Sequence, residues 1–177
     1  DAPDSAKEAA CAAVIHSDDA SDRRAAALRL VGTAARSAGN YDKAIADYTR
    51  ALDLATDAQV LTDRGIAHFL KGGTDGRAAA MRDYDAAIRL DPRHAEALNN
   101  RAWSLFQSGR TTEALADASA SIEANPANGY AYDTRGHILE ALGRRDDAIR
   151  DYERAVAIDA TQEASRTALQ RLRASNR

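Results

Sequence analysis

The sequence predicts an all-α fold in which one helical hairpin is repeated four times. Alanine recurs about 34 residues apart, small residues recur at corresponding positions around it, and a glycine recurs in the middle of each unit. The recurring alanines are Ala44, Ala80, Ala114 and Ala148. A period of this length is typical of stacked helical repeats, in which each unit buries its apolar face only against its neighbours.

Small residues mark where the helices approach one another. We number each unit so that the recurring alanine is place 20, and we call the two helices of a hairpin A and B. Place 8 is Gly32, Gly65, Ala102 and Gly136, and place 27 is Ala51, Ala87, Ser121 and Ala155. Because helices approach closely only where no bulky side chain separates them, places 8 and 20 predict the contact within a hairpin. Place 27 predicts where the next hairpin docks.

The turns and helix ends follow from glycine and proline. Place 15 is Gly39, Gly72, Gly109 and Gly143, which suits the A-to-B turn because glycine takes positive φ without strain. Pro92 and Pro126 fall at place 32 and are expected to end helix B. The second unit has about three extra residues between Lys71 and Arg77, which we expect in its turn. Place 24 is Tyr48, Tyr84, Ala118 and Tyr152, and we expect these rings between successive hairpins.

These six places, in register over four units, resemble the tetratricopeptide repeat family across roughly residues 21–175. The resemblance implies that antiparallel helix pairs stack into a right-handed superhelical solenoid. It also implies a concave wall, lined mainly by A helices, that holds a peptide or the surface of a partner protein. The expected units are 21–57, 58–94, 95–128 and 129–162.

Helices at both ends are expected to cover the stack, because a terminal repeat exposes the face that a neighbour would bury. Residues 1–20 are predicted to form a helix over 4–15, packed on the first A helix, and then a loop. Residues 163–177 are predicted to hold a capping helix that ends near Arg173 and has arginines on its outer face. The chain 1–177 is therefore expected to be a single tetratricopeptide domain.

Arginine and aspartate form a second recurrence. Place 7 is Val31, Arg64, Arg101 and Arg135, and place 23 is Asp47, Asp83, Asp117 and Asp151. A guanidinium beside a close-packed helix contact would be partly buried and would need a carboxylate partner. We predict structural ion pairs with the preceding unit, because the first unit has no predecessor and no arginine. The predicted pairs are Arg64 with Asp47, Arg101 with Asp83, and Arg135 with Asp117.

The family resemblance implies that places 2, 5, 9 and 12 of helix A face the groove. These are Ala26, Arg29, Thr33, Arg36; Gln59, Thr62, Ile66, Phe69; Glu96, Asn99, Trp103, Phe106; and Tyr130, Asp133, His137 and Glu140. Basic groups lie at the first end of this series and acidic groups at the other. The family's clamp for a terminal carboxylate is not expected, since Thr62, Asp63, Asp133 and Thr134 stand where it would need bases.

Large apolar side chains gather in the middle of the predicted groove. They are Ile66, Phe69, Trp103, Phe106 and Tyr130. Exposed aromatic groups of this kind dominate protein interfaces, so these residues are the best candidates for partner contact. The alternative is that Phe69 and Phe106 point into the hairpin core and only Trp103 is accessible.

Composition argues against several other classes of protein. The net charge is −3, with acids and bases interleaved, so neither a nucleic-acid partner nor membrane insertion is expected. The four histidines are dispersed among different units, and Cys11 is the single cysteine, which favours no metal site. No phosphate-binding loop or nucleophile motif is present. We therefore predict no enzymatic activity, no catalytic residue and no cofactor.

The sequence thus predicts a non-enzymatic scaffold or adaptor that binds another protein or a peptide in its groove. A self-assembling unit that forms homo-oligomers through the same groove is the alternative, and a regulatory subunit of an enzyme is a third possibility. Abundant alanine and arginine suggest a GC-rich bacterial genome. The opening Asp1-Ala2-Pro3-Asp4 resembles a processed terminus and favours a periplasmic or exported protein, with a cytoplasmic location as the alternative.

Overall fold

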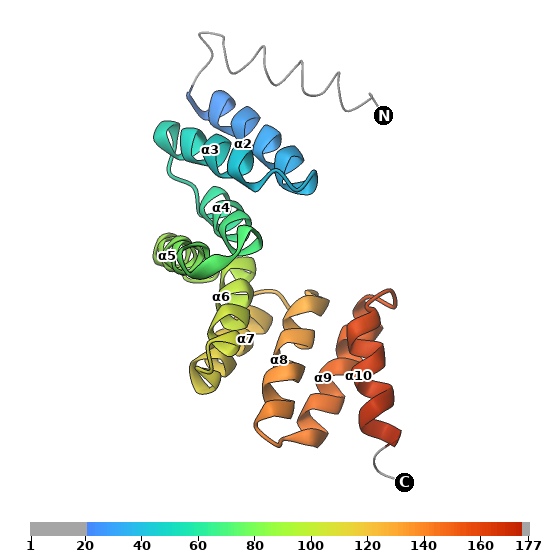
Figure 1. Cartoon of the computed structure of the whole chain (residues 1–177). Coiled ribbons are helices and arrows are strands. Elements are labelled where there is room, and N and C mark those ends of the chain that lie inside the picture. Colours follow the sequence, from blue (N-terminus) through green and yellow to red (C-terminus); the bar gives the residue numbers. More distant parts are fainter. Residues whose placement is uncertain (1–20, 175–177) are drawn as a thin grey trace. The chain divides into compact units, whose positions relative to one another are not determined.

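The computed structural model describes residues 21–174, and every regular element in that range is an α-helix (Figure 1). The helices are α2 (Ser21–Ser37), α3 (Tyr41–Leu54), α4 (Ala58–Lys71), α5 (Gly73–Leu90), α6 (Ala95–Gln107), α7 (Thr111–Ala124), α8 (Gly129–Ala141), α9 (Arg145–Ile158) and α10 (Glu163–Ala174). The predicted all-α fold is confirmed. The helix predicted over 4–15, with Cys11, lies outside the described residues.

The chain divides between Pro92 and Arg93 into two compact units. Unit 1 contains α2 to α5, and unit 2 contains α6 to α10. In unit 1, α2 pairs with α3, α4 pairs with α5, and α3 packs on α4. In unit 2, α6 pairs with α7, α8 pairs with α9, and α7 packs on α8. Each unit therefore holds two of the predicted hairpins.

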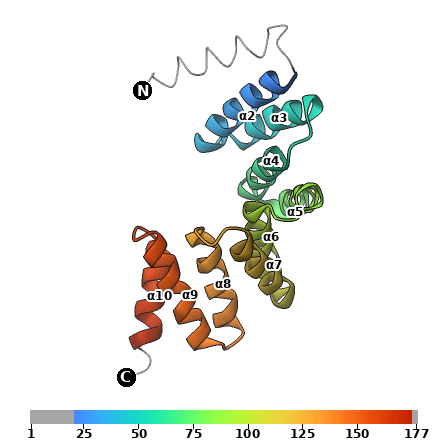
Figure 2. The same ribbon diagram turned by 180° about the vertical axis from the view of Figure 1, so that it is seen from behind.

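The last helix packs on the final hairpin as predicted. In both views, α8, α9 and α10 lie side by side (Figures 1 and 2). The buried apolar side chains of α10, Ala168 and Leu172, join Leu139, Ala148 and Tyr152 in one apolar cluster. The other faces of α10 carry exposed polar and charged groups, which is what a capping helix needs.

Glycine forms the turn of each hairpin. The φ angles at place 15 are +76° at Gly39, +79° at Gly72, +80° at Gly109 and +72° at Gly143. In the third hairpin, the amide after the glycine, Arg110 N, donates to Leu105 O at 3.0 Å. Asn40 and Arg144 make the same bond in the first and last hairpins. These bonds satisfy carbonyls that a helix end otherwise leaves unpaired.

The extra residues of the second unit do not lengthen its turn, contrary to the sequence-based expectation. Helix α5 begins at Gly73, directly after the Gly72 turn, and has 18 residues, whereas α3, α7 and α9 have 14. Since a helical turn takes about 3.6 residues, the insertion adds one turn and keeps later residues on the same face. Gly76 is required there, because a Cβ atom would lie 2.6 Å from the His68 carbonyl oxygen.

The recurring tyrosines pack inside their own hairpins, whereas the sequence suggests a place between hairpins. Tyr48, Tyr84 and Tyr152 are fully buried. A Cβ atom added to the place 8 glycine of the same hairpin would lie 2.6 to 2.8 Å from the ring. The third hairpin has no ring, and it has alanine at both positions, Ala102 and Ala118, which are also fully buried. Glycine at place 8 is therefore matched to an aromatic ring at place 24.

The small residues at places 20 and 27 are all buried. Ala44, Ala80, Ala114 and Ala148 have no exposed surface, and the same holds for Ala51, Ala87, Ser121 and Ala155. Ser121 is the polar member of this set, and its hydroxyl donates to Ala95 O at 2.7 Å. A buried hydroxyl without such a bond would destabilise the fold. At place 27 the contact shown by Ser121 is with helix A of its own hairpin, whereas the sequence analysis expects the next hairpin to dock there.

Candidate functional site

The A helices of unit 2 carry a row of aromatic side chains. Trp103 and Phe106 lie on α6, with their ring centroids 5.7 Å apart. His137 on α8 meets Trp103 edge-on at 5.8 Å. We call these three side chains the aromatic row. Each of them is half-buried, so Phe106 lies on the wall beside Trp103 and retains contact with solvent.

Tyr152 of the last hairpin packs against His137, one of the three rings of the aromatic row. The His137 ring meets the buried Tyr152 ring edge-on at 5.4 Å. The Tyr152 hydroxyl donates to Glu140 Oε2 at 3.3 Å, and burial raises the pKa of that hydroxyl. His137 Nε2 lies 3.7 Å from Asp133 Oδ2. The position of His137 therefore depends on contacts with both α8 and α9.

Tyr130 lies near the start of α8, away from the aromatic row. It is 65% exposed, more than the other large apolar side chains of the described region. Its ring borders a hollow of about 250 Å³ that is also lined by Asp133, Gln162 and Glu163. Tyr130 is thus the most accessible of the large apolar residues predicted for the groove.

Two side chains predicted to face the groove are hydrogen-bonded to the capping helix α10. Glu140 accepts two hydrogen bonds from Arg171 of α10, at 2.6 and 2.8 Å. Asp133 accepts a hydrogen bond from Ser165 of α10. These contacts span about thirty residues of sequence, and the sequence analysis missed Arg171. Counting on from the fourth unit would have found it, since Arg171 falls at place 9 of an incomplete fifth unit.

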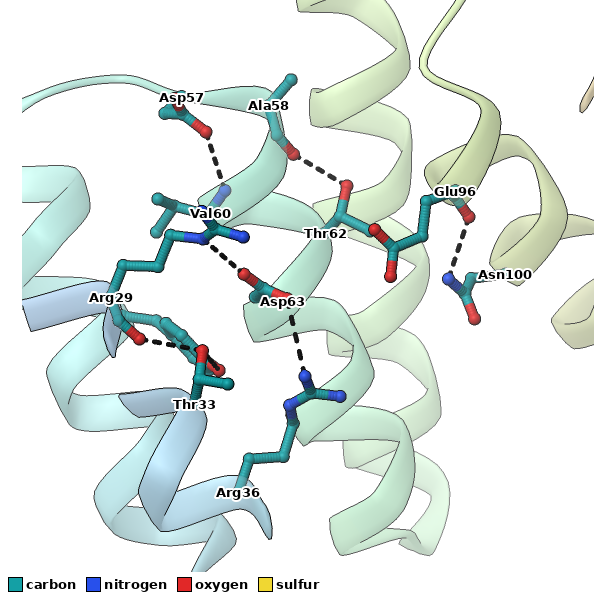
Figure 3. A network of polar contacts seen from close by, with 11 residues as sticks. Arg29, Thr33, Arg36, Asp57, Ala58, Val60, Thr62, Asp63, Glu96 and Asn100 are labelled. Carbon is teal, nitrogen blue, oxygen red and sulfur yellow. Dashed lines mark hydrogen bonds and ion pairs between the residues drawn. The ribbon is translucent and has the colours of Figure 1, made fainter. Parts of the chain in front are cut away.

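In unit 1, a buried carboxylate joins the two A helices (Figure 3). Arg29 Nε of α2 donates to Asp63 Oδ2 of α4 at 2.7 Å. Arg36 Nη2 lies 3.8 Å from Asp63 Oδ1. Between the two arginines, the Thr33 hydroxyl donates to Arg29 O and lies 3.1 Å from the Tyr48 hydroxyl. The sequence predicts Arg29, Thr33 and Arg36 as groove residues. It gives Asp63 only as a reason not to expect the family's clamp for a terminal carboxylate.

Ile66 and Phe69 follow Asp63 along α4, and both are half-buried. Thr62 does not line the wall, contrary to the prediction. It is fully buried, and its hydroxyl donates to Ala58 O at 2.7 Å. Adjacent helical residues point about 100° apart, so the position that reaches the arginines is Asp63. Asn99 of α6 is half-buried, and its Oδ1 has no hydrogen-bond partner among the described residues.

The predicted register of the ion pairs is wrong. Arg64 pairs with Asp83, Arg101 with Asp117, and Arg135 with Asp151, each through two hydrogen bonds of 2.6 to 2.9 Å. Each arginine therefore binds the aspartate of its own hairpin. Asp47, whose hairpin has Val31 at place 7, accepts instead from Lys43 and Arg50 of α3.

The physical reason is the symmetry of an antiparallel hairpin. Arg101 and Asp117 both stand eight residues from the turn at Gly109, so the hairpin brings them side by side. Arg135 and Asp151 have the same relation to Gly143. Arg64 also contacts the preceding hairpin, where its Nη1 donates to Thr49 Oγ1 at 3.1 Å.

Comparison with known proteins decides the family. Models of the tetratricopeptide repeat match residues 25–58, 73–129 and 129–161, which together cover more than half of the chain. The chain belongs to the tetratricopeptide repeat family. Tetratricopeptide domains are protein–protein interaction modules.

Solved tetratricopeptide structures share this fold. The first TPR domain of Spaghetti (RPAP3) bound to the HSP90 peptide SRMEEVD has a TM-score of 0.62 and 23% identity, over 68% of this chain and 94% of that one. The TPR domain of Arabidopsis OM64 has a TM-score of 0.61 and 24% identity, over 67% and 95%. PilF of Pseudomonas aeruginosa has a TM-score of 0.80 and 17% identity, over 89% and 71%. At these identities the likeness concerns the fold.

The A helices of the tetratricopeptide hairpins present contact surfaces. Across residues 21–174, no three His, Cys, Asp or Glu side chains are grouped so that they could hold a metal ion. Every helix in the same range is too short or too polar to cross a membrane. The A helices of unit 2 offer a partner aromatic side chains, and those of unit 1 offer the guanidinium groups of Arg29 and Arg36.

The Glu140–Arg171 pair makes the attachment of the tetratricopeptide cap helix sensitive to acid. The hydrogen bonds from Arg171 lower the pKa of Glu140 from 4.5. A carboxylate with a lowered folded-state pKa stabilises the protein above about pH 4.5, and this contribution is lost as the pH falls through the folded value. Because Arg171 is largely exposed, we expect Glu140→Gln to cost about 1 kcal/mol or less near neutral pH.

Urea unfolding of the native protein and Glu140→Gln, at neutral pH and near pH 3, measures this effect. The difference in unfolding free energy between the two proteins should shrink at the lower pH. A difference that is the same at both pH values would contradict a role for the ionised Glu140 side chain. Glu153→Gln is a useful comparison, because Glu153 contacts Arg173 of the same helix and is more exposed.

Proposed function

We propose that this tetratricopeptide repeat protein is a non-enzymatic scaffold that binds a segment of a partner protein along the A-helix wall of unit 2. The observation that carries the proposal is the aromatic row of Trp103, Phe106 and His137. Large rings that are half-exposed on a rigid helical surface are costly to leave in water, and they supply much contact area when a partner covers them.

The rigidity of the row favours binding. Trp103 and His137 are held by ring contacts to neighbours on three helices, so little side-chain freedom remains to be lost on association. Tyr130 adds an exposed ring at the other end of α8. Binding hot spots are enriched in Trp and Tyr, and they tend to lie in well-packed surroundings of this kind.

The comparison with the Spaghetti domain supports a peptide as the ligand class, since that domain is described in complex with an HSP90 peptide. The proposed contact in unit 2 is aromatic. Two of the acidic side chains on this wall, Asp133 and Glu140, are engaged by α10. A partner segment rich in apolar side chains therefore fits unit 2 best.

We expect Trp103→Ala to weaken partner binding about tenfold or more, as truncation of a hot-spot aromatic does. The partner is first isolated by affinity capture with the native protein and identified, and its affinity for each variant is then measured by calorimetry. Tyr132→Ala is the matched control, because Tyr132 also lies on α8 but its ring contacts Arg135 and Arg154. Equal affinity of the native protein and Trp103→Ala for the same partner would exclude the aromatic row as the binding site.

Homo-oligomerisation through the same row is separated from partner binding by light scattering. A protein that stays monomeric as its concentration rises would leave the row available for a partner. Association that grows with concentration and is abolished by Trp103→Ala would assign the row to a second copy of the chain.

A further inference from the structure

A hollow of about 240 Å³ lies among α7, α8 and α9 in unit 2. Arg135 and Leu139 line it from α8, and each stands two residues from His137. Because residues two apart on a helix point about 160° from one another, the hollow lies on the face of α8 opposite the aromatic row. It is therefore separate from the surface proposed for the partner.

One part of the hollow is apolar. Leu115 of α7 packs against the apolar cluster that contains Leu139. Beside them, Ser119 of α7 is half-buried. Within residues 21–174 its hydroxyl makes no hydrogen bond, so it can still donate to a bound group.

The rest of the lining is charged. Arg135 binds Asp151 through two hydrogen bonds of 2.7 and 2.8 Å. Arg144 Nε donates to Asp147 Oδ2 at 2.7 Å, and Arg150 Nη2 donates to Asp147 Oδ1. Two guanidinium groups thus share one carboxylate.

The three arginines keep donors that the protein does not use. A guanidinium has five N–H donors. Within the described part of the chain, the Nη1 groups of Arg135, Arg144 and Arg150 make no hydrogen bond. The Arg144 and Arg150 side chains are 53% and 67% exposed. An acceptor that enters the hollow can therefore reach free N–H groups.

The third arginine is not part of the repeated framework. The third hairpin has an equivalent of Arg144, since Arg110 donates to Glu113 three residues further on. At place 22, however, it has Ala116 where the last hairpin has Arg150. A hairpin of this kind thus folds without an arginine at place 22, and Arg150 adds positive charge that the packing of the hairpin does not need.

The charge and the directions of the donors identify the ligand class. Three guanidinium groups and two carboxylates leave a net charge of +1. The first turn of α9 borders the hollow and adds about half a positive charge, and the Arg144 side chain does not cap its amides. A phosphate monoester carries about −1.5 to −2 charges at neutral pH. Because the donors come from three helices, they suit a tetrahedral anion better than a planar carboxylate.

We propose that Arg135, Arg144 and Arg150 bind a phosphate group in this hollow, either as free phosphate or as a monoester, with Ser119 as a further donor. One water molecule needs roughly 15 Å³ of such space, so the hollow is large enough for a phosphate. Leu115 and Leu139 would contact the carbon atoms next to an ester oxygen. The site goes beyond the proposed function and does not depend on it.

The test is a calorimetric titration of the full chain with sodium phosphate at pH 7, in a buffer that contains no other oxyanion. Sodium chloride at the same ionic strength is the reference. We expect saturable binding of one phosphate per chain and no saturable heat with chloride. Equal behaviour of the two salts, or heats that never saturate, would overturn the proposal.

Two variants and one control show which side chains bind. Arg150→Gln and Arg144→Gln should each weaken phosphate binding about tenfold or more, as loss of a charged hydrogen bond does. Arg150 is 67% exposed, so its variant should keep the native fold, which urea unfolding checks. Arg110→Gln removes the corresponding arginine of the third hairpin and should leave the affinity unchanged. Unchanged affinity in Arg150→Gln, or an equal loss in Arg110→Gln, would contradict the assignment.

Two further probes identify the source and shape of the anion. N-acetylphosphoserine amide carries the phosphate as an ester: tighter binding than inorganic phosphate assigns the site to an ester, and weaker binding assigns it to free phosphate. Acetate that binds as tightly as phosphate would overturn the assignment to a tetrahedral anion. Trp103→Ala should leave the phosphate titration unchanged, so the phosphate site and the aromatic row can fail independently.

Discussion

Replacing Tyr152 with alanine is expected to destabilise unit 2 by about 3 to 5 kcal/mol, as for other buried aromatic residues. The ring is fully buried against Gly136, and its removal leaves a cavity between α8 and α9. The variant also loses the edge contact with His137 and the hydrogen bond to Glu140. Urea unfolding followed by tryptophan fluorescence measures the change, because Trp103 is the single tryptophan and lies in unit 2.

Gly136→Ala tests whether the glycine at place 8 is required by the Tyr152 ring at place 24 of the same hairpin. In the native background, the new Cβ would lie 2.7 Å from the Tyr152 ring, and we expect a net loss of about 1 to 3 kcal/mol. In the Tyr152→Ala background, the methyl group enters the cavity, and alanine favours the helix by about 1 kcal/mol over glycine. The same substitution should then be stabilising.

The change of sign is the decisive result of this double-mutant cycle. The third hairpin, with Ala102 and Ala118, is a natural version of the doubly substituted protein. If Gly136→Ala costs the same free energy in both backgrounds, the ring and the glycine are not coupled, and the recurrence of glycine at place 8 needs another explanation.

Arg101→Ala is expected to destabilise unit 2 by about 2 to 3 kcal/mol. The substitution leaves Asp117 without its two hydrogen bonds, at a site where the side chains are 24% and 13% exposed. Removing one partner of a fully buried pair costs about 3 to 5 kcal/mol, and the partial exposure of Arg101 reduces that figure. Arg50→Ala is the control. Its pair with Asp47 is more exposed at the arginine and should contribute about 1 kcal/mol or less.

The register of the pairs is tested by combining Arg101→Ala with Asp117→Asn or with Asp83→Asn. We expect a coupling energy of about 1 to 3 kcal/mol for Asp117, which touches the arginine, and additive effects for Asp83. Coupling to Asp83 instead would restore the pairing with the preceding hairpin that the sequence first suggests. An unchanged melting temperature in Arg101→Ala would show that the pair is a surface feature.

Much of the fold could be predicted because its signals are local. Gly109 takes positive φ at the turn, Ala114 packs where the helices meet, and the helix after Gln162 carries the pattern of a cap. The sequence places Trp103, Phe106 and His137 at family groove positions, but the apolar patch it predicts contains Phe69 and Tyr130 and leaves out His137. The sequence could not show which groove side chains form hydrogen bonds with other helices, as Asp133 and Glu140 do with α10.

The errors have a common physical cause. Thr62 and Asp63 are adjacent in sequence, and the roll of α4 against α2 decides which one meets the arginines. Arg101 pairs with Asp117 because the hairpin brings together residues equally far from its turn. The inserted residues after Gly72 join α5 because an added helical turn preserves the packing face.

The sequence by itself determined the helices, their turns and the small residues at their contacts, because period, glycine and side-chain volume act within one hairpin. Only the tertiary structure decided the ion-pair register, the attachment of Asp133 and Glu140 to α10, and the placement of Arg29 and Arg36 over Asp63. Those features depend on how separate helices meet, and a helix rotated by one residue presents a different side chain to its neighbour.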